Sequence, residues 1–198
     1  ALRRNRESFG RLRRLPRVLR DVSGRRLERR LLDHTLPAPL LVAPTGLNGL
    51  VRRDGDVALA RAAAAHGIPF VLSSASTTAI EEVAERAGGE LWFQLYVLSA
   101  RSFAERLMRR ARDAGYRVLV LTVDVPVSGA RERDRRNGFR MPFRLTTSLA
   151  LDACLHPRWS LDLLRGGMPE LVNMRTEGAG DMAAQAALLA RQMDTSLD

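Results

Sequence analysis

Four short groups of polar residues follow four short apolar runs, and a helix-like stretch follows most of these groups. The groups contain hydroxyl, amide, phenol and carboxylate side chains, which can hydrogen-bond a polar ligand and stabilise charge that develops on a substrate. They are Pro44-Thr45-Gly46, Ser73-Ser74, Trp92-Phe93-Gln94-Leu95-Tyr96 and Leu121-Thr122-Val123-Asp124. In a barrel of parallel strands the carboxyl ends of all strands open onto one face, where active sites are built. We therefore expect the four groups to meet in space.

Each polar group lies at the end of a predicted strand. Residues 39–44 form an apolar run bounded by prolines, which is typical of a strand buried on both faces. The other strands are predicted at residues 69–73, 91–96 and 117–123. The strand centres recur every 22 to 29 residues, which is the spacing of repeated strand–helix units.

Amphipathic helices are predicted between the strands, and each is followed by a glycine suited to a left-handed cap. They cover residues 56–66, 78–87 and 102–114. Thr78, with Glu81 three residues later, forms a capping-box pattern at the start of the second helix. This order of elements predicts an α/β fold, the N-terminal half of a (β/α)8 TIM barrel with about four strand–helix units and an extended loop or lid segment.

The regular pattern stops after Asp124. Residues 125–141 are polar and rich in arginine, which indicates a loop over the barrel mouth, and residues 148–174 match no regular element. We interpret the chain as one incomplete domain, with an N-terminal cover at 1–38, strand–helix units at 39–124, an active-site loop and lid at 125–180, and a helix at 181–198. Half a barrel leaves strand edges unpaired, so we expect a partner chain or further sequence to complete it.

The composition is that of a globular protein, with 198 residues, 45% of them hydrophobic and 27% charged. Cys154 is the only cysteine, which excludes an internal disulfide and favours a cytoplasmic redox setting. No apolar run approaches the roughly 20 residues of a membrane-spanning helix. The chain begins with Ala rather than Met, which we interpret as a start partway into a longer product.

The positive charge is concentrated in the first thirty residues. The net charge is +10, and all 32 basic residues are arginine. Residues 1–30 hold twelve arginines against three acidic residues, so this segment alone carries +9. Such a segment could follow the phosphates of a nucleic acid or lie on an anionic membrane. Because leucines, valines and a phenylalanine are interleaved with the arginines, we interpret it instead as a folded amphipathic stretch, and no nucleic-acid partner is expected.

These motifs resemble the FMN-dependent 2-hydroxy acid dehydrogenases and oxidases, in order and with matching spacing from about Asn5 to the end of the chain. Besides the strand-end groups, the resemblance rests on Arg131-Glu132-Arg133-Asp134 and Asn137-Gly138-Phe139. Within that family, residues 44–49 and 154–162 resemble the group that oxidises mandelate. The resemblance implies the oxidation of a 2-hydroxy acid, (S)-mandelate or a related aryl hydroxy acid, to the 2-keto acid.

The resemblance also implies that FMN is the cofactor and that six residues contact it. They are Pro44, Thr45, Gly46, Ser73, Gln94 and Thr122. These residue types agree with the chemistry, because a flavin lying flat across a barrel mouth needs hydrogen-bond partners and little bulk beside its ring. Each residue taken alone has a plainer interpretation, in which Gly46 ends a strand and Ser73 and Thr122 cap helices.

Three further residues would serve the substrate by the same resemblance. Tyr96 would hydrogen-bond the substrate hydroxyl or the developing keto oxygen, and Asp124 would pair with a histidine that acts as the base. Arg131 would receive the substrate carboxylate, for which its guanidinium is suited. The alternatives are a phenol that faces water, a loop carboxylate, and a solvated run of charges over residues 131–136.

The sequence departs from the family pattern at the base itself. The family places this histidine in a His-Gly-Gly-Arg string and a lysine on an earlier strand, whereas this sequence has no lysine and no such string. His34, His66 and His156 all lack that context. A tyrosine expected early in the chain is also absent. We therefore expect the catalytic His and Lys in a C-terminal half that the sequence does not contain, and no turnover by the chain alone.

Residues 148–174 correspond, in the resemblance, to a segment that sits on a membrane surface. Its leucines, Trp159, Arg158 and Arg165 fit insertion into a membrane interface, which predicts a cytoplasmic protein that is peripheral on the inner face. A lid packed on its own barrel, or a subunit contact in the expected homo-oligomer, is an equal alternative. The electron acceptor, oxygen or a membrane quinone, is open.

A function of another class is also open. The chain would then be a non-catalytic barrel half that acts by association, with its twelve N-terminal arginines binding a polyanion. A flavin absorbance band that copurifies with the protein would favour the enzyme.

Overall fold

The computed structural model describes residues 2–96, 98, 100–123, 132–138 and 147–174. A parallel three-stranded sheet with the order β3-β4-β5 lies at its centre. Its strands are β3 (Phe70–Ser73), β4 (Leu91–Tyr96) and β5 (Val118–Thr122). The strands predicted at 69–73, 91–96 and 117–123 are confirmed to within one residue at either end.

The strand predicted at residues 39–44 is reduced to a single bridge. Val42 donates its backbone N–H to Pro69 and accepts from Val71, at 2.9 and 3.0 Å, and is bridged to Phe70 in parallel. Leu40 is 61% exposed, so the prediction that both faces of this run are buried is wrong. The prolines that bound the run have no N–H to donate, which limits how far a ladder can extend along it.

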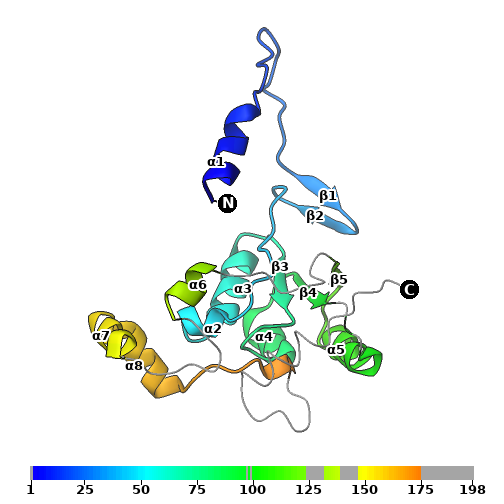
Figure 1. Cartoon of the computed structure of the whole chain (residues 1–198). Coiled ribbons are helices and arrows are strands. Elements are labelled where there is room, and N and C mark those ends of the chain that lie inside the picture. The colour runs from blue at the N-terminus through cyan, green and yellow to red at the C-terminus, as the bar shows by residue number, and fades with distance from the viewer. Residues whose placement is uncertain (1, 97, 99, 124–131, 139–146, 175–198) are drawn as a thin grey trace.

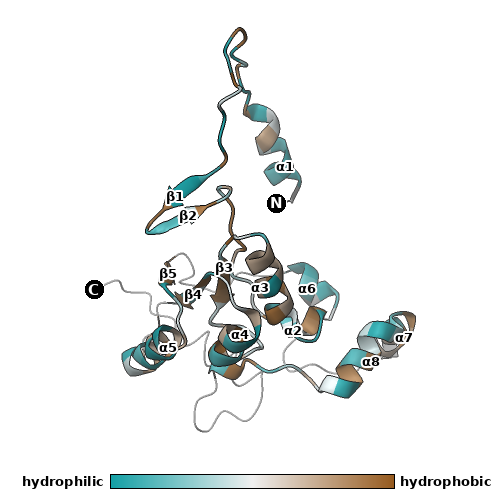
Figure 2. Ribbon diagram, turned by 180° about the vertical axis from the view of Figure 1, so that it is seen from behind, coloured by the Kyte–Doolittle hydropathy of each residue, from teal (hydrophilic) through white to brown (hydrophobic). Residues whose placement is uncertain are grey.

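Three helices cover one face of the sheet, as Figures 1 and 2 show. They are α3 (Gly55–Ala65), α4 (Ile80–Ala87) and α5 (Arg101–Asp113), and they confirm the predicted strand–helix units. The glycines expected after them, Gly67, Gly88 and Gly115, all have positive φ. A left-handed residue at a helix end is costly for any residue with a Cβ, which explains why glycine occupies these positions.

The capping box predicted at Thr78 is wrong. Helix α4 begins at Ile80, and the residue before it is Ala79, whose side chain cannot accept a hydrogen bond. The cap comes from far along the chain, because Asn173 Oδ1 accepts the Ile80 N–H at 3.1 Å. Thr78 is buried, and its carbonyl accepts from Asn173 Nδ2 at 3.0 Å.

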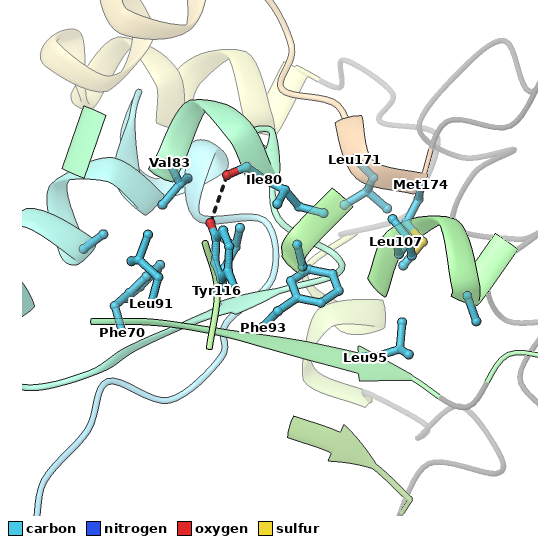
Figure 3. Packing of buried hydrophobic residues seen from close by; sticks show 14 of the residues in the cluster. Phe70, Ile80, Val83, Leu91, Phe93, Leu95, Leu107, Tyr116, Leu171 and Met174 are labelled. Atoms are coloured by element: carbon cyan, nitrogen blue, oxygen red, sulfur yellow. Dashed lines mark hydrogen bonds between the residues drawn. The ribbon is translucent and has the colours of Figure 1, made fainter. Parts of the chain in front are cut away.

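The hydrophobic core lies between the sheet and these helices (Figure 3). Phe93 packs edge-on to Tyr116, with ring centroids 6.1 Å apart. The Tyr116 hydroxyl donates to the carbonyl of Ile80 at 3.0 Å, which ties the start of β5 to the first turn of α4. Burial raises the pKa of Tyr116 well above its ordinary value, so this phenol stays protonated and keeps its hydrogen bond.

The N-terminal segment extends away from the sheet in both views (Figures 1 and 2). It contains helix α1 (Leu2–Arg11) and a hairpin of β1 (Arg29–Leu31) and β2 (His34–Leu36). The hairpin contacts the body through Leu36, which is buried, and through His34 Nε2, 3.2 Å from Glu90 Oε1. Residues 3–33 are exposed, so the amphipathic stretch is helical only over α1 and its apolar side chains have no partner among the described residues.

Residues 148–174 were expected to be irregular, and this prediction is wrong. They hold α7 (Thr147–Leu155), α8 (Pro157–Gly166) and the 3-10 helix η1 (Val172–Met174). Pro157 occupies the first turn of α8, where its missing N–H costs nothing, and this separates the two helices. Two shorter helices are α2 (Asn48–Val51) and α6 (Glu132–Arg136). The helix predicted at 181–193 lies outside the described residues.

Candidate active site

The carboxyl ends of β3, β4 and β5 bring together the polar groups that the sequence singled out. Ser73 is the register partner of Gln94, and Tyr96 is the register partner of Thr122. The parallel pairing aligns these strand ends, because residues in register lie side by side across the sheet. The expectation that these residues meet is confirmed for the three strands.

A continuous ladder of hydrogen bonds links the side chains of Ser73, Gln94 and Thr122. Gln94 Oε1 accepts from Ser73 Oγ at 3.1 Å and from the backbone N–H of Ser74 at 3.2 Å. Gln94 Nε2 donates to Thr122 Oγ1 at 2.8 Å. A backbone N–H can only donate, so the contact with Ser74 fixes which end of the Gln94 amide is the oxygen.

This ladder determines what the strand ends can offer to a ligand. The Gln94 oxygen already has several donors, whereas its NH2 group uses one hydrogen and keeps one without an acceptor among the described residues. Thr122 Oγ1 accepts from Gln94, and its own hydrogen has no acceptor within the same part of the chain. The ladder therefore presents donors, which suit carbonyl oxygens and unprotonated ring nitrogens of a ligand.

The loop that follows the Val42 bridge packs directly against the loop after β3. The Leu47 N–H donates to the carbonyl of Ala75 at 3.1 Å. A Cβ on Gly46 would lie 3.2 Å from both Cβ and O of Ala75, tighter than most real contacts, so glycine permits this close approach. This packing holds Pro44, Thr45 and Gly46 beside the end of β3, as the sequence predicted for this polar group.

A network of hydrogen bonds around the buried Asp56, which sequence analysis missed, holds this loop in place. Asn48 Nδ2 donates to Asp56 Oδ1 at 2.7 Å, and Asn48 Oδ1 accepts from Thr45 Oγ1 at 3.0 Å. Asp56 is 0% exposed, and its second oxygen accepts from the N–H and hydroxyl of Thr77 at 3.3 and 3.2 Å. The hydroxyl of Thr77 also accepts from the Gly49 N–H at 2.9 Å. An acidic residue in the first turn of a helix is ordinary, so the sequence carried no signal for this role.

The catalytic candidates are only partly described. Tyr96 is half-buried at the end of β4, beside Thr122. Asp124 and Arg131 lie outside the described residues. None of the three histidines of the sequence lies at the carboxyl end of a sheet strand: His34 belongs to β2, His66 ends α3, and His156 separates α7 from α8.

A cleft of about 190 Å³ lies away from the ladder. It is lined by residues of α2, of the turns beside α3 and α4, and of α8, and the ladder residues are not among them. Its walls include Gly49 of α2, Thr77 of the loop after β3 and Trp159 of α8, so the cleft lies between α8 and these two segments.

Parallel strands with helices on one face and a polar ladder at their carboxyl ends define part of a (β/α)8 barrel with its site at the barrel mouth. Comparison of the chain with known proteins agrees with this class. Residues 1–198 match the family described as FMN-dependent dehydrogenase. The chain therefore belongs to the FMN-dependent dehydrogenase family, and it folds as the N-terminal half of that barrel.

Individual relatives show how the chain relates to this family. It is 48% identical over 197 residues to (S)-mandelate dehydrogenase of Pseudomonas putida, which covers 100% of this chain and 50% of the relative. It is 46% identical over 176 residues to L-lactate dehydrogenase of Pseudomonas paraeruginosa (strain DSM 24068 / PA7), covering 88% of this chain and 46% of the relative. The solved structure of monotopic membrane protein (S)-mandelate dehydrogenase superposes with a TM-score of 0.90 at 48% identity, covering 100% of this chain and 52% of that one. The chain spans about half the length of these relatives.

Proposed function

We propose that this chain forms the N-terminal half of an active site that uses FMN to oxidise a 2-hydroxy acid, (S)-mandelate or a related aryl hydroxy acid, to the 2-keto acid. The observation that carries the proposal is the donor ladder of Ser73, Gln94 and Thr122 across three aligned strand ends. Membership of an FMN-dependent family and the identity to (S)-mandelate dehydrogenase support the reaction class and the substrate.

The residues present fit one edge of a flavin. FMN, when bound, supplies a two-electron acceptor whose ring carries carbonyl oxygens and ring nitrogens along its edge. Gln94 and Thr122 would donate to these atoms, and Ser73 holds the Gln94 amide in position. Pro44, Thr45 and Gly46 would lie beside the ring, where the absence of a side chain on Gly46 leaves the backbone accessible.

The substrate would be bound and oriented by the residues at the rim. Tyr96 would donate its phenol hydrogen to the oxygen of the reacting carbon and stabilise the charge that develops there. Arg131 would hold the substrate carboxylate as an ion pair, and Asp124 would orient a neutral histidine base and stabilise the charged form that it reaches on taking the proton. That base and the flavin-facing lysine would come from polypeptide beyond this chain, because the sequence has no lysine and its histidines lie elsewhere.

Flavin titration of the purified chain tests the ladder. Thr122→Val keeps the shape of the side chain but removes the hydroxyl, and we expect FMN to bind about five- to tenfold more weakly, as for one lost hydrogen bond. Gln94→Met should weaken FMN further, because it also leaves the serine donors without their acceptor. Thr35→Val, at the exposed position of β2, is the matched control and should leave affinity unchanged. Equal FMN affinity in all four proteins would contradict the proposed flavin contacts.

Turnover tests where the base resides. The chain alone, loaded with FMN and given (S)-mandelate under anaerobic conditions, should show no bleaching of the flavin absorbance. A longer polypeptide that adds the His-Gly-Gly-Arg strand should bleach it. Rapid bleaching by the chain alone would show that a residue within it acts as the base.

Residues 147–168, which hold helices α7 and α8, support a peripheral attachment to a membrane, which we place on the cytoplasmic face. Its exposed apolar side chains are Leu151, Leu155, Leu161, Leu164 and Met168. Arg158 and Arg165 are also exposed and would meet anionic headgroups. One solved relative is titled a monotopic membrane protein. Among the described residues no helix has the length and apolar character needed to cross a bilayer.

Vesicle flotation tests this attachment. The chain should float with vesicles of phosphatidylcholine and phosphatidylglycerol, and the double variant Leu161→Ser, Leu164→Ser should stay at the bottom of the gradient. Leu119→Ser and Leu121→Ser together provide a control, since both leucines are exposed on β5, outside helices α7 and α8. Equal flotation of both variants would assign the binding to another surface.

Association without catalysis is the second candidate function, and two observations favour it. The leucines of β5 are exposed at the sheet edge, and the arginine-rich segment before β1 is exposed along its length. A homo-oligomer or a bound polyanion would cover such surfaces. Salt-dependent binding to nucleic acid by a chain that retains no flavin would support this function over the enzyme.

A further inference from the structure

The segment from α8 to η1, residues 157–174, contacts the two stretches that follow proposed flavin residues: helix α2, after residues 44–46, and the loop after β3, which follows Ser73. At its first end, Trp159 Nε1 donates to the backbone carbonyl of Leu50 at 2.7 Å. Leu50 belongs to α2, and the last carbonyls of a helix have no partner within the helix. Trp159 therefore satisfies the carboxyl end of α2, directly after the Pro44–Leu47 turn, rather than pointing into a membrane interface.

At its second end, the segment caps the start of α4 and bonds to the loop after β3. Asn173 is 1% exposed, and its Oδ1 accepts the first N–H of α4. Its Nδ2 donates to Ser76 Oγ at 2.8 Å and to the Thr78 carbonyl at 3.0 Å. The Ser76 N–H in turn donates to the carbonyl of Ser73, a ladder residue, at 3.0 Å. Asn173 is thus one hydrogen-bonded residue away from the ladder.

The part between these two ends is seated on the same loops. A Cβ on Gly49 would lie 3.1 Å from Pro169 Cβ, so the chain after α8 passes close to α2. Leu171 and Met174 are buried in the core near Leu107 of α5, which anchors η1 firmly (Figure 3). At the first end, the side-chain hydrogen bond from Trp159 to Leu50 lies beside the cleft.

We propose that residues 157–174 act as a strap that couples the exposed leucines of α7 and α8 to the loops beside the proposed flavin residues, with Trp159 and Asn173 as its positioning residues. This inference rests on the proposed function, because it assigns these loops to FMN. Helix α8 belongs to the strap and carries the exposed Leu161 and Leu164, so a surface that binds these leucines also restrains the strap. Two ligands that stabilise the same arrangement of one element bind with positive coupling, and each raises the affinity for the other.

The first experiment measures FMN affinity in the full chain. Trp159→Phe keeps an aromatic ring but removes the N–H that bonds Leu50. We expect about a tenfold weaker affinity for FMN, which corresponds to the loss of one hydrogen bond between neutral groups. Asn173→Asp keeps the acceptor for Ile80 and removes both donated bonds, and it should weaken FMN similarly. Trp92→Phe is the matched control, since Trp92 donates to Glu90 before β4, at the other end of the sheet. Thermal unfolding of each variant shows that the fold is retained.

The second experiment separates a strap from a residue that merely supports the fold. Vesicles of phosphatidylcholine and phosphatidylglycerol should tighten FMN binding to the wild-type chain by about fivefold or more, the usual lower range for two coupled sites. The same vesicles should leave FMN affinity unchanged in Trp159→Phe, although this variant still floats. Trp92→Phe should respond as the wild type does.

The outcomes are distinct. If the wild type binds no FMN, the proposed function fails and the strap falls with it. If the wild type binds FMN but Trp159→Phe has the same affinity and the same response to vesicles, only the strap is wrong. If Trp159→Phe loses thermal stability while its vesicle response persists, Trp159 has a structural role and the coupling is refuted.

Discussion

Strands β3 and β5 flank the same central strand and are both strongly apolar, yet their surroundings differ completely. All four residues of β3 are buried, whereas Leu119 and Leu121 of β5 are 45% and 51% exposed. The Val42 bridge lies beyond β3, and no strand pairs with the outer edge of β5 among the described residues. Within the described residues, the Ser73 side of the site is therefore covered by a further segment, while the edge of the sheet on the Thr122 side is unpaired.

The largest expected effect is a contrast in stability between these two strands. Leu72→Ala in β3 removes a fully buried side chain and should lower the free energy of unfolding by about 3–5 kcal/mol. Leu119→Ala in β5 removes a side chain that is already half solvated, so we expect a loss of about 1 kcal/mol. Urea titration followed by circular dichroism measures both. Equal losses would mean that β5 is covered in solution, for example by a second copy of the chain.

Substitution of the buried Asp56 should have the next largest effect on stability, because its carboxylate joins α2 to the loop after β3. Asp56→Ala leaves Asn48 and Thr77 without their common acceptor, and we expect a loss of about 2–4 kcal/mol in the free energy of unfolding. Asp33→Ala is the matched control, since the Asp33 side chain is 97% exposed and should cost less than about 0.5 kcal/mol. A cost for Asp56→Ala as small as that of the control would show that water replaces the carboxylate.

The close packing of the two loops can be tested with a methyl group. A Cβ on Gly49 would lie 2.6 Å from Thr77 Oγ1 and 3.1 Å from Pro169, so Gly49→Ala should destabilise the fold by about 1–3 kcal/mol. Gly24→Ala is the control, because nothing lies within 4 Å of its Cβ. Loss of stability on Gly24→Ala instead would mean that the exposed segment before β1 packs against something.

The sequence predicted the elements whose signals are local. The strand at 91–96 has the bounds that the structure gives to β4, and the glycines after three helices mark where those helices end. The grouping of Ser73, Gln94 and Thr122 also followed from one rule, that parallel strands align their carboxyl ends. These signals depend on periodicity and backbone freedom, which single sequences carry well.

Two features that the sequence did not predict depend on contacts between distant residues. The start of α4 was placed at Thr78 because the local pattern resembled a capping box, whereas the cap is Asn173. The hydrogen bond from Trp159 to Leu50 was not predicted either, because the sequence leaves a membrane interface and a lid packed on the barrel as equal alternatives for this segment. An asparagine or a tryptophan carries no local mark of such a partner, so only the packed structure reveals it.

The smallest expected effect is a pH dependence at the junction of α4, α5 and η1. Arg110 donates two hydrogen bonds to Glu81, both 2.7 Å long, and one to Asn173 at 3.1 Å. Hydrogen bonding to Arg110 lowers the pKa of Glu81 below its ordinary value of 4.5, and partial burial opposes this only in part.

A carboxyl whose pKa is lower in the folded state stabilises the fold above its unfolded pKa and loses that contribution as the pH falls through the folded value. We therefore expect Glu81→Gln to cost well under about 1 kcal/mol at neutral pH, since the pair is half exposed, and to flatten the loss of stability below pH 4.5. Urea titrations between pH 3 and pH 7 measure this slope. Arg110→Gln should flatten it in the same way, because the guanidinium is the cause of the shift. A slope that persists in Arg110→Gln would assign the acid sensitivity of this junction to a different carboxyl.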